Sequence, residues 1–387
     1  MKPVMLHGIT WNHSRALPPL VATAQRFEEL HPHVRIQWEK RSLHEFGHAD
    51  IVTLARNFDL LVIDHPMVGD AEATGVLNDL LPLLSVEELK NLQDDSLGPC
   101  FSSYMYKGRL YALPIDAAAP AASYRPDLFE QHDLKEPAVW SDVISLARRG
   151  WVRIPAFSAD LFLNFMGLCV SRGSSVAVSP EQLVDHEIGA QCLDQLSELA
   201  ALMPDDIYRL NPIALYERMS SEDTFAYCPF AYTYSNYSRK GFGAKHILFS
   251  NPVPLEEDLP MRTVLGGTGI AISTKCEQIA LALEYSLFVA DRSCQSTIYG
   301  ICGGQPASRS AWRDPLLNQL TDNFFAQTAA SIETAYVRPR YSGYVNLQER
   351  AGEAIAEYCK QRGNTQALLA RIDVLYRSSL KEGMQRV

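Results

Sequence analysis

The stretch from Tyr111 to Phe129, with the sequence YALPIDAAAPAASYRPDLF, constrains the fold of this chain most strongly. It predicts a strand that leaves one domain, a short crossover, and a strand that enters a second domain. The first half is apolar and β-prone up to Pro114. Because proline has no N–H to donate within a sheet, we expect the first strand to end there. A helix is expected to begin at Asp127, since the helix dipole favours a carboxylate in the first turn.

The length and charge of the chain limit its class. Its 387 residues are too many for most single hydrophobic cores, so two domains are expected. The net charge of −10 argues against a nucleic-acid partner, because a phosphate-binding surface needs a basic stripe. No apolar run approaches the ~20 residues that span a bilayer.

The first residues and the cysteines bear on the compartment. Met1 is followed by Val4-Met5-Leu6 without a basic segment or an apolar stretch of secretory length. We expect a periplasmic or extracellular protein if a leader has been removed, and a cytoplasmic one if Met1 is the native start. The 8 cysteines are scattered, with no C-x-x-C pair and no cysteine–histidine spacing that suits a zinc site. Most of them are therefore expected to be reduced core residues. Stray thiols favour the cytoplasmic alternative.

The segments on either side of the crossover predict an α/β fold. Residues 4–9 read as a buried strand, 17–30 as an amphipathic helix and 34–39 as an alternating strand. The run from Phe58 to Asp64, FDLLVID, is continuously apolar, as is typical of a strand buried on both faces of a parallel sheet.

Three motifs resemble one known family. The crossover offers Tyr111 and Pro114 and then the run Tyr124-Arg125-Pro126-Asp127-Leu128-Phe129. The opening β-α-β unit contains A-x-x-F-E-E-x-H-P-x-V-x-I, and a later segment contains G-x-x-P-A at Gly303 to Ala307. Together they resemble the extracellular solute-binding proteins of family 1, the maltose-binding-protein class of ABC-transporter receptors, over nearly the whole chain.

The resemblance implies a two-lobed periplasmic-binding-protein fold of type II. Each lobe is expected to hold a mainly parallel sheet flanked by helices, with the ligand cleft between the lobes. Residues 1–114 plus 265–308 would form lobe one, and residues 115–264 plus 309–387 would form lobe two. The expected partners are a small-molecule ligand and the permease subunits of an ABC transporter, and the chain is expected to be a monomer without a cofactor.

Candidate ligand-binding residues follow the predicted strands, because ligands of α/β folds bind outside the carboxyl ends of parallel strands. Trp11, Asn12 and His13 follow the first strand, Asp64 and His65 the third, and Asp116 lies on the crossover. The resemblance adds aromatic contacts from the loop that holds Tyr232 and Tyr234. At Gly267 and Thr268 a ligand would approach bare backbone; a nucleotide fingerprint would need a helix after these glycines, and an apolar strand follows instead.

Two ligand classes stay open at this point. Sugars stack on aromatic rings and bind carboxylates and amides, which favours a sugar or sugar-like ligand. Arg309 and Arg340, with Arg338, offer the alternative of an organic carboxylate held by guanidinium groups.

Catalysis and metal binding are not expected. The sequence holds no G-x-S-x-G elbow, no H-E-x-x-H motif and no Walker loop. His31 and His33 form an isolated H-x-H pair, which is more often surface polar sequence than a metal site. Asp64, His65 and Asp116 would act as acid and base only if they converged. An enzyme or a cytoplasmic ligand sensor on the same bilobal scaffold is the alternative function.

Overall fold

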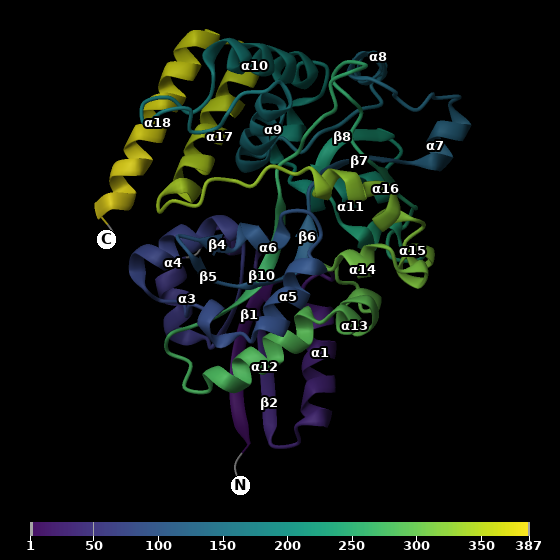
Figure 1. Ribbon diagram of the computed structural model, residues 1–387. Coiled ribbons are helices and arrows are strands. Elements are labelled where there is room, and N and C mark those ends of the chain that lie inside the picture. The colour runs from purple at the N-terminus through teal and green to yellow at the C-terminus, as the bar shows by residue number, and fades with distance from the viewer. Residues whose placement is uncertain (1–2, 49, 386–387) are drawn as a thin grey trace.

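The computed structural model describes residues 3–48 and 50–385, which form two regions, each with its own sheet and helices (Figure 1). The first region holds a five-stranded sheet in the order β2-β1-β3-β10-β6. Its strands are β1 (Val4–Trp11), β2 (Val34–Arg41), β3 (Leu60–Ile63), β6 (Leu113–Ala118) and β10 (Gly266–Ile272). β1 runs parallel to β2 and β3, whereas β10 is antiparallel to both of its neighbours.

The opening unit forms as its hydrophobic pattern predicts. Helix α1 (Leu17–Leu30) buries Leu20, Ala24 and Phe27 against the sheet, and every residue of β3 is buried. The central place of β3 in the sheet explains its continuous apolar run.

The expectation that a strand ends at Pro114 is wrong, because β6 continues through Pro114 to Ala118. β6 is an edge strand of the five-stranded sheet, and the register of its pairing with β10 shifts between Thr268 and Gly269. A proline that cannot donate is tolerated at such an edge and beside such an irregularity. β7 (Pro120–Tyr124) follows after one residue, so the crossover consists of two nearly continuous strands.

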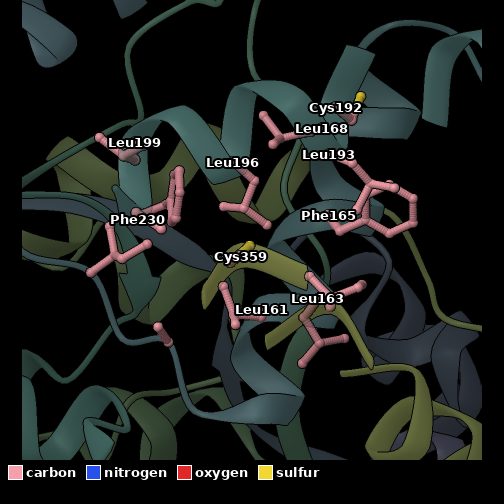
Figure 2. Packing of buried hydrophobic residues seen from close by; sticks show 14 of the residues in the cluster. Leu161, Leu163, Phe165, Leu168, Cys192, Leu193, Leu196, Leu199, Phe230 and Cys359 are labelled. Atoms are coloured by element: carbon pink, nitrogen blue, oxygen red, sulfur yellow. The ribbon is translucent and has the colours of Figure 1, made fainter. Parts of the chain in front are cut away.

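The second region differs from the expected parallel sheet. Its three strands, β7, β8 (Tyr227–Tyr232) and β9 (Leu248–Ser250), lie in the order β8-β7-β9, and both pairings are antiparallel. Helices α9 (Ser158–Ser171), α10 (His186–Ala200), α17 (Tyr344–Gln361) and α18 (Thr365–Gln385) cover this region at the top of Figure 1. Figure 2 shows side chains of α9 and α10 that meet Phe230 of β8 and Cys359 of α17 in a shared core.

Shorter elements connect these parts. The other helices are α2 (Leu43–His48), α3 (Ile51–Asn57), α4 (Val68–Thr74), α5 (Val86–Asp94), α6 (Cys100–Ser103), α7 (Pro126–Gln131), α8 (Trp140–Arg148), α11 (Pro212–Ser221), α12 (Ile279–Ala290), α13 (Arg292–Cys294), α14 (Arg309–Trp312), α15 (Pro315–Leu320) and α16 (Phe324–Glu333). A hairpin of β4 (Met105–Tyr106) and β5 (Arg109–Leu110) connects other parts of the chain. The remaining short elements are the 3-10 helices η1 (His65–Met67), η2 (Leu81–Leu83), η3 (Asp205–Arg209) and η4 (Ser235–Ser238) and the π-helical segment η5 (Gln295–Tyr299).

The buried hydrophobic residues fall into separate clusters. One takes its members from residues 6–115 and 270–299, and another from residues 122–264 and 344–376. A third, built mainly from residues 210–249 and 307–335, also includes Ala117 and Leu265. The third cluster also takes Leu97, Cys100 and Ala119, so the chain passes between the first cluster and the others near residues 80–101, 115–117, 265–270 and 299–307. Within the described ranges, no helix combines the length and apolarity that a membrane crossing requires.

Candidate ligand-binding site

A cavity of about 460 Å³ lies where the ends of the first region's strands meet the second region. The five-stranded sheet contributes Trp11 from β1, Asp64 after β3 and Gly266 to Thr268 of β10. The second region contributes Asp160 of α9 and Tyr232 and Tyr234 at the end of β8, together with residues of η3, α11 and α17. The volume is within the range of small-molecule sites.

Aromatic rings form much of the cavity wall. The lining includes Trp11, Phe46, Phe157, Tyr232 and Tyr234. The rings of Trp11 and Phe46 pack with their centroids 5.0 Å apart. Rings offer flat apolar faces on which the C–H groups of a small ligand can pack, so this wall is suited to a ligand with apolar edges.

Arg15 at the cavity is paired with a buried carboxylate. Its Nε donates to Asp116 at 2.8 Å, its Nη2 donates to the other carboxylate oxygen, and its Nη1 donates to the carbonyl of Thr233 at 2.7 Å. Burial acts to raise the pKa of Asp116, and the contacts with Arg15 oppose this rise. Arg15 also lies 4.9 Å from the ring centre of Tyr234. This arginine therefore joins the loop after β1 to the crossover strand and to the segment after β8.

A second ion pair, between Asp64 and Arg338, lies in the cavity wall. One nitrogen of Arg338 donates to both oxygens of Asp64 at 2.6 Å, and another donates to Gln348 at 3.2 Å. Burial opposes ionisation of Asp64, but the Arg338 charge and a contact with His65 outweigh it and lower the pKa of the carboxyl to about 2. Asp64 is thus a carboxylate whose charge is balanced by its neighbour.

Asp160 differs from both of these carboxylates. It lies in the first turn of α9 and lines the cavity, and no residue of the described chain gives it a hydrogen bond or an ion pair. Burial raises its pKa to about 8. The carboxyl oxygens of Asp160 are therefore available to accept hydrogen bonds from a ligand.

Other polar atoms of the lining also lack partners. The Nε1 of Trp11, the hydroxyl of Tyr232 and the hydroxyl of Thr268 are buried and find no hydrogen-bond partner among the described residues. Buried polar groups are nearly always satisfied, so unpaired groups that face one cavity indicate a ligand or bound water there.

Six of the predicted site residues line this cavity: Trp11, Asp64, Tyr232, Tyr234, Gly267 and Thr268. Two more support it from behind, since Asp116 binds Arg15 and His65 contacts Asp64 at 3.2 Å. His13 packs edge-on against Tyr234, with ring centroids 4.7 Å apart, and Asn12 is exposed.

The two arginines predicted as an anion clamp lie elsewhere. Arg309 pairs with Glu333 at 3.1 Å, and Arg340 donates to the backbone carbonyls of Ser102, Ser103 and Met105. Neither is among the residues that line the cavity.

Several lining residues were not predicted. Arg15 follows the first strand by only a few residues, and its place after that strand was a usable signal. Asp160 lies in the first turn of α9, and nothing in the local sequence distinguishes its carboxyl from a solvated one. Phe46, Phe157 and Arg209 come from loops and short helices whose position depends on tertiary packing.

A second cavity, of about 420 Å³, lies between α5, α12 and the segment that holds Ala307 and Ser308. No aromatic residue is found in its described lining, and Asp95 is engaged by Ser308 and Ser310. The aromatic cavity is therefore the better candidate for the ligand site. In the described chain, no group of three or more His, Cys, Asp or Glu side chains is placed to hold a metal ion.

Comparison with known proteins agrees with this architecture. The model of the family described as bacterial extracellular solute-binding protein matches residues 10–290. A mannitol-binding protein of Pseudomonas aeruginosa is 34% identical over 128 residues, which cover 32% of this chain and 28% of that protein. The match thus spans less than a third of that relative's length.

Solved structures resemble almost the whole chain. An ABC-transporter solute-binding protein from Agrobacterium radiobacter, in complex with ribitol, has a TM-score of 0.80 at 19% identity, covering 98% of this chain and 99% of that one. Another, from Agrobacterium vitis with bound D-mannitol, has a TM-score of 0.77 at 15% identity, covering 98% of each chain. These likenesses confirm the predicted two-lobed α/β fold. With the family match over residues 10–290, they show that this chain belongs to the bacterial extracellular solute-binding proteins.

Proposed function

We propose that this chain is the solute receptor of an ABC-type importer and that it binds an uncharged polyhydroxy compound, a sugar alcohol or a small sugar. The proposal rests on which polar groups of the aromatic cavity are already paired with other residues and which are not. Arg15 and Arg338 are each paired with a carboxylate, whereas Trp11 Nε1 and the hydroxyls of Tyr232 and Thr268 have no partner in the described chain. Hydroxyl groups donate and accept, so a polyol can satisfy such a wall.

The polyol preference has independent support. The relative from Pseudomonas aeruginosa is a mannitol-binding protein, and the two Agrobacterium structures hold ribitol and D-mannitol. Aromatic rings beside open polar atoms suit the alternating C–H and O–H groups of such molecules.

An organic carboxylate is less well supported by the cavity. A carboxylate ligand needs guanidinium or ammonium groups with free donors. Arg309 and Arg340 are engaged outside the lining, and Arg209 is the one lining arginine that lacks a partner in the described chain. Arg209 is exposed, so it is screened by solvent.

The lobes are proposed to divide as residues 1–114 plus 265–308 and residues 115–264 plus 309–387. The separation of the two large hydrophobic clusters supports this division. Near the boundaries, the buried side chain of Gln305 donates to the carbonyl of Ala117 and to Thr233, and accepts from the backbone of Ser235. Because both regions supply cavity walls, tight binding requires the lobes to close.

The family is extracellular, and its members bind small molecules for ABC transporters. We propose for this chain the same extracytoplasmic place, a docking role towards permease subunits, a monomeric state and no catalysis of its own. The absence of a nucleophile motif in the sequence supports the last point.

A thermal-shift screen of the purified chain tests the proposal. Mannitol, ribitol, other polyols, monosaccharides, maltose, and aliphatic and aromatic acids would be compared, because a ligand that binds only the native state raises the melting temperature. We expect shifts with polyols or sugars and none with acids. Small-angle scattering with a saturating hit should show compaction of the particle. A shift with acids alone would contradict the polyol assignment, and a hit without compaction would contradict the closure mechanism.

A further inference from the structure

Among the described residues, the cavity lining holds one carboxyl without a partner, Asp160, beside several polar groups that are open to donate. Trp11 Nε1 can only donate, and the hydroxyls of Tyr232 and Thr268 are free to donate. Asp64 already accepts two contacts from Arg338, so its capacity is largely used. Asp160 is the lining carboxyl to which no described residue donates.

A bound polyol must offer acceptors to the open donors of the cavity wall, and its own hydroxyl hydrogens must also find acceptors. Its oxygens can accept from the indole and the two hydroxyls of the wall, which leaves its own hydroxyl hydrogens in need of acceptors. Where the bound ligand displaces water, an unmade hydrogen bond costs the full desolvation of the group. The ligand hydroxyls are therefore drawn to Asp160, and an ionised carboxylate accepts them more strongly than a neutral acid.

We propose that Asp160 accepts the hydroxyl hydrogens of the bound polyol as a carboxylate, and that loading the site releases the Asp160 proton to solvent. The inference rests on the proposed function and deepens it. The step balances, because the carboxylic acid O–H bond breaks, the proton leaves to buffer, and hydroxyl O–H···O⁻ hydrogen bonds replace it.

The electrostatics of the cavity agree with this step. Burial raises the pKa of Asp160 to about 8, so the empty site holds the proton at neutral pH. Hydrogen bonds from ligand hydroxyls favour the charged form and lower that pKa on binding. Polyols have no group that titrates between pH 6 and 9, so a proton released there comes from the protein.

The other titratable groups in or near the cavity can be separated from Asp160. Burial raises the pKa of Cys228 and Tyr234 to about 12 and that of Tyr232 further still. Burial first, and then neighbouring arginines, lower the pKa of His13 and His65 to about 4. These groups keep their charge between pH 6 and 9.

The remaining charges come from other elements. Arg15 with Asp116 and Arg338 with Asp64 form pairs beside the cavity, η3 contributes Arg209, and α17 contributes the uncharged Gln348. The buried Asp116 is the other carboxyl that burial shifts upward, so a variant at Asp160 is needed to assign the proton.

Isothermal titration calorimetry on the full chain tests this inference with D-mannitol and ribitol as probes. Titrations at pH 7 in buffers of different ionisation enthalpy count the protons released, and titrations from pH 6 to 9 follow the affinity. We expect about one proton released per ligand at pH 7 and roughly tenfold tighter binding per pH unit up to about pH 8. Asp160→Asn should release no proton, bind ~10- to 100-fold more weakly at pH 8 and lose the pH dependence.

Asp258→Asn is the matched control, because Asp258 is exposed and lies outside the cavity lining. It should behave as the unmodified chain. Binding with no proton released at pH 7, or an Asp160→Asn chain that still releases one, overturns this inference alone. If Asp160→Asn fails to fold, the proton count of the unmodified chain still decides. A chain that binds no polyol or sugar at all overturns the proposed function together with the inference.

Discussion

The guanidinium of Arg338 donates to both carboxylate oxygens of Asp64 at 2.6 Å, across 274 residues of sequence. Asp64 directly follows β3 of the five-stranded sheet. Arg338 precedes α17 and also binds Gln348 on that helix. The side chains of Arg338 and Asp64 are 4% and 25% exposed, so the pair joins the two regions where solvent screening is reduced.

Loss of Arg338 should therefore destabilise the protein strongly. In Arg338→Met the carboxylate of Asp64 stays in the wall without its partner, and removing one member of a buried pair costs about 3–5 kcal/mol. Urea denaturation measures this change. Arg309→Met is the matched control, because Arg309 pairs with Glu333 near the surface, with 36% and 35% of the side chains exposed, and should cost only about 0–1 kcal/mol. Equal losses in the two variants would contradict this assessment.

The same pair predicts an acid dependence. The pKa of Asp64 is about 2 in the folded protein, below its unfolded value of 3.8. The native state thus binds fewer protons than the unfolded state between these values, and the stabilisation is present above about pH 4 and lost as the pH falls through about 2. The difference in unfolding free energy between the unmodified chain and Asp64→Asn should shrink by about 2 kcal/mol over that interval. A constant difference for Asp64→Asn would show that the pair is not ionic.

Local sequence predicted the parts of the fold whose pattern is local. α1 spans Leu17–Leu30 as its apolar spacing predicts, and β3 is buried as its apolar run predicts. Pro114 was misread because its tolerance depends on β6 being at the sheet edge, and the strand order is not written in the local sequence. The antiparallel second sheet was missed for the same reason.

The residues of the candidate site also divide into those that the sequence could predict and those that it could not. Trp11 and Asp64 were found because Trp11 ends β1 and Asp64 directly follows β3 of the same sheet, which brings them to the same edge. Arg309 and Arg340 could not be separated from Arg338 by sequence, since all three are arginines in one part of the chain. Their roles differ only through partners far away in sequence: Glu333, backbone carbonyls and Asp64. Asp160 was missed because the absence of a partner is a property of the folded cavity.

The indole N–H of Trp11 should contribute to binding separately from its ring. Trp11→Phe keeps an aromatic face in the wall and removes Nε1, which has no partner in the described chain. We expect a ~5- to 20-fold weaker affinity for a polyol, as the loss of one hydrogen bond predicts. Trp38→Phe is the control, because the Nε1 of Trp38 donates to Tyr285 at 3.1 Å outside the cavity lining. If calorimetry finds the same affinity for both variants, Trp11 does not bind ligand through its indole nitrogen.

Gly267 is predicted to be required for the pairing of β10 with β6. Its φ is +99°, and a Cβ at this position would lie 2.2 Å from the backbone oxygen of Asp116. A side chain would therefore be strained by its backbone conformation and would also push β10 away from the crossover strand that carries Asp116. Gly267→Ala should destabilise the protein by more than about 3 kcal/mol or prevent folding, measured by urea denaturation.

Gly108→Ala is the matched control, because Gly108 has a φ of +78° with no atom within 4 Å of the added Cβ. That variant should lose only about 1 kcal/mol from backbone strain. If Gly267→Ala were no less stable than Gly108→Ala, the contact with Asp116 would not be what requires glycine there.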